Sequence, residues 1–161
     1  MGVQLMKRLV AAVIGIVACL SLSACQAGGG QASTILIEGQ KCQVTNLGEE
    51  TKNGVSTVAV TIDPGKVSAD WQGDKTKAAL LLAGGEEYAA AAFGAVLTSD
   101  GQATAVVVWF DVPNGIQLDN AKFAYDDKSV MLPAASGRDG LVLTRQDASA
   151  RFWKAGGLVA G

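Results

Sequence analysis

The chain has 161 residues, of which 49% are hydrophobic, and 13 basic against 15 acidic residues give a formal net charge of −2. Histidine is absent, which removes the most common general base and metal ligand together with Ser-His-Asp and Cys-His nucleophile arrangements. No basic cluster points to nucleic acid, and no glycine-rich stretch matches a phosphate-binding fingerprint. We therefore predict a chain that is not an enzyme and has no cofactor, no metal and no nucleic-acid partner.

Residues 1–24 have the three-part pattern of a secretory signal peptide. Lys7 and Arg8 precede an almost purely apolar run over residues 9–22, which is short for the roughly 20 residues of a bilayer span. A buried core helix is the alternative, but such a helix should carry a polar stripe, and this run has none. The pattern favours an export signal.

The end of this run is more specific than an ordinary cleavage site. Leu22-Ser23-Ala24-Cys25 resembles the lipobox of bacterial lipoproteins. In that class of signals a lipid is attached to the cysteine thiol, and cleavage leaves the cysteine as the first residue. We therefore predict lipid attachment at Cys25 and a location at the cell membrane, facing the extracytoplasmic side. Residues 25–33 continue as a small, uncharged, glycine-rich segment and are predicted to form a flexible tether.

After the tether, short apolar runs alternate with turn residues. Seven β-branched or alternating runs are predicted strands: 33–39, 41–47, 55–63, 103–112, 121–127, 128–133 and 140–145. The dipeptide Asn53-Gly54 predicts a turn, and Asp100-Gly101 predicts a hairpin of the two-residue type I′ form. Both faces of run 103–112 are largely apolar, which predicts a central strand, whereas polar residues 66–76 are predicted to form a loop.

Residues 77–97 give conflicting signals. Helix propensity alone favours a helix over residues 86–97, whereas Gly84-Gly85 and the hairpin after Leu97 favour two strands. We predict strands. The resulting set of short strands predicts an all-β fold, a β-sandwich over residues 34–145. The tail, residues 146–161, has no clear strand pattern, and Phe152 and Trp153 either pack back on the body or belong to a loose end.

A resemblance to a known family is carried by residues 88–132. A polar hairpin leads into a strand that ends in Phe-Asp-Val-Pro at 110–113, and the next strand carries Phe123 and then Tyr125-Asp126. This pattern resembles small bacterial surface lipoproteins of unknown function, whose immunoglobulin-like sandwich is similar to the immunoprotective extracellular antigen of mycobacteria. The earlier run at 54–62 also fits, although Asp63-Pro64 stands where the family usually has Asn. The resemblance implies an immunoglobulin-like β-sandwich and transfers no catalytic residue.

Two single residues remain open. Cys42 alternates with Val44 on one strand face, which favours a buried position, and an exposed thiol that pairs with another chain is the alternative. Trp71 lies among polar residues, where it either contacts a partner or covers one end of the sandwich. Acid pairs at 49–50, 86–87 and 126–127 lack calcium-loop spacing and are predicted to be solvated turns.

These observations predict a membrane-anchored extracellular lipoprotein that acts as a binding or structural module of the bacterial envelope. Its contact with the membrane is the N-terminal lipid, and an envelope protein or a wall component is the expected partner. The alternative is a carrier of a small apolar ligand or lipid, suggested by the apolar runs at 80–82 and 106–109. A carrier needs an internal cavity, whereas a sandwich of this size normally fills its core with side chains.

Overall fold

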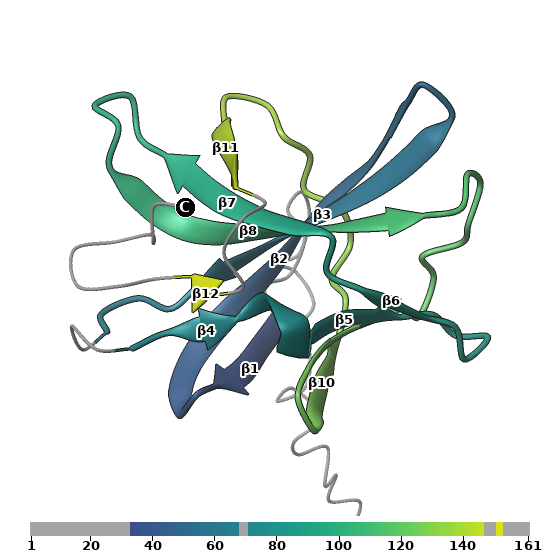
Figure 1. The fold of residues 1–161 in the computed structure, drawn as a ribbon, viewed down its shortest axis with the longest axis horizontal. Coiled ribbons are helices and arrows are strands. Elements are labelled where there is room, and N and C mark those ends of the chain that lie inside the picture. The colour runs from purple at the N-terminus through teal and green to yellow at the C-terminus, as the bar shows by residue number, and fades with distance from the viewer. Residues whose placement is uncertain (1–32, 68–70, 147–150, 153–161) are drawn as a thin grey trace, which may run out of the picture.

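A computed structural model describes residues 33–67, 71–146 and 151–152 of the chain (Figure 1). The regular structure in these residues is antiparallel strand, apart from the short 3₁₀ helix η1 (Lys75–Lys77). The predicted signal peptide and Cys25 lie outside the described residues. No helix in the described part of the chain has the length and apolar character needed to span a bilayer.

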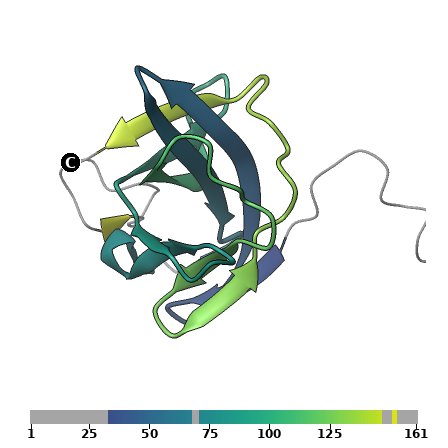
Figure 2. The same ribbon diagram turned by 90° about the vertical axis from the view of Figure 1, so that its right-hand side faces the viewer.

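Two antiparallel sheets pack against each other, which confirms the predicted all-β sandwich; Figure 2 shows the strands wrapped around a common interior. The larger sheet has the order β1 (Ser33–Ile37), β2 (Gln40–Lys52), β3 (Val55–Asp63), β8 (Ala103–Val112), β7 (Ala92–Leu97), β11 (Val142–Gln146). The smaller sheet has the order β10 (Lys128–Met131), β9 (Lys122–Tyr125), β5 (Ala78–Leu81), β6 (Glu87–Ala89). A short pair joins β4 (Gly73–Asp74) to β12 (Arg151–Phe152).

The core lies between the sheets and follows from the two-residue period of the strands. On β8, Val106, Val108 and Phe110 point inward and are fully buried. Phe110 meets Phe123 of β9 across the core, with ring centroids 6.2 Å apart in an edge-to-face arrangement. The opposite face of β8 is also buried, because Val107 and Trp109 belong to a second apolar cluster. The prediction of a central strand at 103–112 is confirmed, since β8 lies between β3 and β7.

The ambiguous residues 77–97 form strands, as predicted, but three of them rather than two. β5 and β6 pair in the smaller sheet, whereas β7 pairs with β8 in the larger one. The chain passes from the smaller to the larger sheet at Ala90 and Ala91. The Ala90 N–H donates to the backbone carbonyl of Ala78 in β5, and the Ala91 N–H donates to the backbone carbonyl of Trp109 in β8. Helix propensity is overridden here because β5 and β7 find partners far along the chain, β9 and β11, and β6 pairs with β5.

The two predicted turns differ in geometry. Asn53 and Gly54 both have positive φ, 53° and 79°, as the two-residue type I′ turn requires, and they connect β2 to β3. The prediction of the same turn at Asp100-Gly101 is wrong. Thr98 pairs with Gln102 through a three-residue loop, and of the loop residues only Gly101 has positive φ. Its N–H donates to the Thr98 carbonyl, which is the type I turn with a glycine bulge.

The predicted loop over residues 66–76 contains short regular structure. β4 and the start of η1 fall within it, and the Asp74 carboxylate caps η1 by accepting the Thr76 N–H at 3.0 Å. β4 pairs with β12, which lies within the stretch predicted as a tail. Residues 151–152 are therefore placed beside the body of the sandwich, while Trp153 lies outside the described residues.

Candidate functional site

Trp71, for which the sequence left a partner contact and a covering role open, is a covered residue. Its side chain is only 7% exposed and belongs to the main core cluster. The indole N–H donates to the backbone carbonyl of Ile37 at 3.0 Å, which links the loop to the end of β1. Of the two roles left open by the sequence, the structure favours the covering role. The polar residues around Trp71 gave no sign that the ring reaches back to β1.

Cys42 is fully buried on β2, which confirms the interpretation as a small core residue and excludes the exposed thiol. Its Sγ donates weakly to the Gln40 carbonyl at 3.5 Å. Burial raises the pKa of the thiol to about 12, with a smaller contribution from the negative charge of Asp63. The thiolate is the reactive form, so this cysteine is chemically inert in the folded protein.

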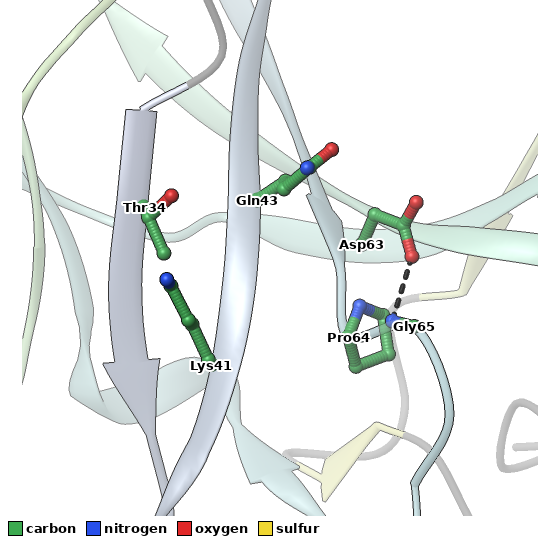
Figure 3. Close-up of a pocket in the computed structure, with 6 residues that line it drawn as sticks. All are labelled: Thr34, Lys41, Gln43, Asp63, Pro64 and Gly65. Atoms are coloured by element: carbon green, nitrogen blue, oxygen red, sulfur yellow. Dashed lines mark hydrogen bonds between the residues drawn. The ribbon is translucent and has the colours of Figure 1, made fainter.

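A shallow polar pocket of about 340 Å³ lies on the outer face of the larger sheet near its β1 edge; we call it the edge pocket (Figure 3). Its lining residues come from the first three strands and the turn that follows: Thr34, Lys41, Gln43, Asp63, Pro64 and Gly65. Strand pairing sets Thr34 opposite Gln43, and Gln43 opposite Asp63, so these three side chains form one row across the sheet. The inward positions beside them hold core residues such as Cys42, and the period of two therefore turns this row to the outside.

Some groups of the edge pocket are held by hydrogen bonds within the protein, and others are available to bind a ligand. The Gly65 N–H donates to the Asp63 carboxylate at 2.8 Å, and the Gln40 side-chain amide donates to the Pro64 carbonyl at 2.8 Å. The side chains of Thr34, Lys41 and Gln43 make no hydrogen bond or ion pair with the described residues. A hydroxyl, an ammonium and an amide are therefore open to a ligand beside a carboxylate held by the turn.

The chemistry of the edge pocket is that of hydrogen bonding. Its six lining residues include no nucleophile with an adjacent general base, and no aromatic ring on which a ligand could stack. In the described residues, His, Cys, Asp and Glu form no group of three or more that could hold a metal ion. The arrangement suits recognition of a polar group.

A second polar cluster, which the sequence did not reveal, has a structural role. The buried Tyr125 hydroxyl donates to a Glu38 carboxylate oxygen at 3.0 Å and accepts the Asp74 N–H at 2.7 Å. Lys77 lies 2.6 Å from the same Glu38 oxygen. These hydrogen bonds, first from Lys77 and then from Tyr125, hold the pKa of Glu38 below its ordinary value. The cluster ties the β1–β2 turn to β4 and β9.

Comparisons of the chain with protein families, curated proteins and solved structures found no match. The resemblance to bacterial surface lipoproteins therefore stays a prediction.

Proposed function

We propose that the chain is a lipoprotein anchored on the extracytoplasmic face of a bacterial cell membrane, and that its sandwich acts as a binding or structural module of the envelope. The observation that carries this proposal is Leu22-Ser23-Ala24-Cys25, placed between an apolar run and a glycine tract. The first strand begins at Ser33. The segment from Cys25 to Ser33, if extended, spans at most about 28 Å, which keeps the folded body close to the membrane surface.

The filled interior supports a module rather than a carrier of an apolar ligand. Phe93, Phe110 and Phe123 are fully buried between the sheets and occupy the space in which a carrier would hold its cargo. The edge pocket, by contrast, lies at the surface and offers mainly polar side chains. Both observations favour a partner that contacts the outside of the sandwich.

The three cysteines of the chain provide a direct test of the anchor. In a bacterial host that processes lipoproteins, the wild-type chain should incorporate an alkyne-labelled fatty acid, and Cys25→Ser should abolish the label. Cys19→Ser in the apolar run and Cys42→Ala in the core are matched controls that should keep it. A wild-type chain without label, or a Cys25→Ser chain that retains it, would contradict the proposal.

A further inference from the structure

A second pocket lies at the end of the sandwich where the β5–β6 turn meets the connection between β8 and β9. Both segments lie at the right of Figure 1 and face the viewer in Figure 2. The pocket measures about 400 Å³, and we call it the end pocket. Its aliphatic walls are Leu82, Pro113 and Ile116, Tyr88 contributes an aromatic ring, and the carboxylates are Glu86 and Asp119.

Hydrogen bonds hold both walls of the end pocket in place. In the β5–β6 turn, the Leu82 N–H donates to the Glu86 carbonyl at 2.9 Å. In the facing connection, the Ser56 hydroxyl donates to the Asn114 side chain at 3.2 Å, and the Ala121 N–H donates to the Leu118 carbonyl at 3.0 Å. A pocket whose walls are already ordered loses little conformational entropy when it binds.

Polar side chains of the end pocket lack hydrogen-bond and ion-pair partners among the described residues, and its charged side chains are all acidic. Within the described residues, the Tyr88 hydroxyl and the carboxylates of Glu86 and Asp119 make no side-chain hydrogen bond or ion pair. No Lys or Arg is among the lining residues. Leu82 and Ile116 are half-buried and pack against the main core. The pocket thus combines an apolar surface, an aromatic ring and uncompensated negative charge.

We propose that the end pocket binds a basic peptide segment by seating one long cationic side chain, lysine or arginine. The aliphatic stem lies against Leu82 and Ile116, as such stems do on apolar surfaces. The charged tip reaches the carboxylates of Glu86 and Asp119, and Tyr88 adds a cation–π contact. The proposal rests on the proposed function in that it names the chemistry of the module's partner. A basic partner also complements the acidic balance of the chain.

The test uses the full-length lipoprotein in nonionic detergent and a pair of short peptides. One is acetyl-Gly-Lys-Gly-amide, and the other carries norleucine, which has the same stem without the charge. In an NMR titration, the lysine peptide should shift backbone amide resonances at 82–88 and 113–119 more strongly than the norleucine peptide, and added salt should weaken the effect. Asp119→Asn and, independently, Glu86→Gln should each weaken binding about fivefold.

Asp139→Asn is the matched control, because it removes one exposed carboxylate that lines neither the edge pocket nor the end pocket and should leave peptide binding unchanged. Equal shifts with both peptides would overturn the proposal, as would wild-type affinity in both end-pocket variants. A neutral disaccharide that shifts the same resonances, when the lysine peptide does not, would overturn it in favour of a glycan. Fatty-acid labelling at Cys25 is unaffected by any of these results, so the two proposals fail separately.

Discussion

Tyr125 connects distant parts of the chain through a single hydroxyl group, which joins Glu38 and Asp74. Tyr125→Phe keeps the buried ring but leaves the Asp74 N–H without this acceptor. We expect the free energy of unfolding to fall by about 1–2 kcal/mol, the usual cost of removing one partner of a buried hydrogen bond. Urea unfolding should show a lower midpoint with an unchanged m-value.

Tyr88→Phe is the control for this substitution. The Tyr88 hydroxyl makes no hydrogen bond with the described residues, so its removal should change the unfolding free energy by less than about 0.5 kcal/mol. If both substitutions destabilise the protein equally, the hydroxyl of Tyr125 has no special role in linking the strands.

For single residues, the sequence could predict which face of a strand a side chain lies on, but not which distant residue it contacts. The alternation that placed Phe123 and Tyr125 on one face is confirmed, since both belong to the main core cluster and Ala124 between them does not. The partner of Tyr125 at Glu38 could not be predicted, because the two residues are brought together only when β1, β4 and β9 assemble. Trp71 illustrates the same limit, since its hydrogen bond to Ile37 depends on where a loop folds back.

At the scale of the strands, the close contact between β7 and β11 requires a glycine, Gly94, on β7. A Cβ atom at Gly94 would overlap the backbone carbonyl of Thr144 on β11, and it would lie 2.9 Å from Cη2 of Trp109. Gly94→Ala should therefore force β11 away from β7 and cost about 3 kcal/mol. Hydrogen exchange should become faster in β7 and β11 while the β2–β3 hairpin keeps its protection. Unchanged exchange in β11 would show that the strand tolerates the methyl group.

The elements also show where sequence patterns stop being informative. Strands 55–63 and 103–112 were predictable because β-branched runs between turn residues have few alternatives. The change of sheet at Ala90 and Ala91 was not, because alanines carry almost no signal for either sheet. The three-residue loop at 99–101 was mistaken for a two-residue turn because Asp-Gly fits both hairpin types and the strand register decides between them.

On the scale of the whole molecule, the sandwich was predictable from the number and spacing of strands, whereas the order of strands was not. β8 separates β3 from β7, and the Ser33 hydroxyl at the start of β1 donates to the Met131 carbonyl of β10 at 2.8 Å. Neither pocket could be predicted, since each joins segments that are distant in sequence. The proposed lipid anchor is different, because the pattern that predicts it is contained in four consecutive residues.

The central claim, lipid on Cys25, is tested most directly by counting reactive thiols in the protein extracted from membranes. Under this proposal, removal of the signal peptide would discard Cys19, and a lipid thioether at Cys25 would not react. Cys42 is buried, and its pKa is raised to about 12 by that burial, so it should react only after unfolding. We expect no thiol to react with a maleimide in the native protein and one to react in denaturant. A thiol that reacts in the native protein, or two that react after denaturation, would contradict the lipid anchor.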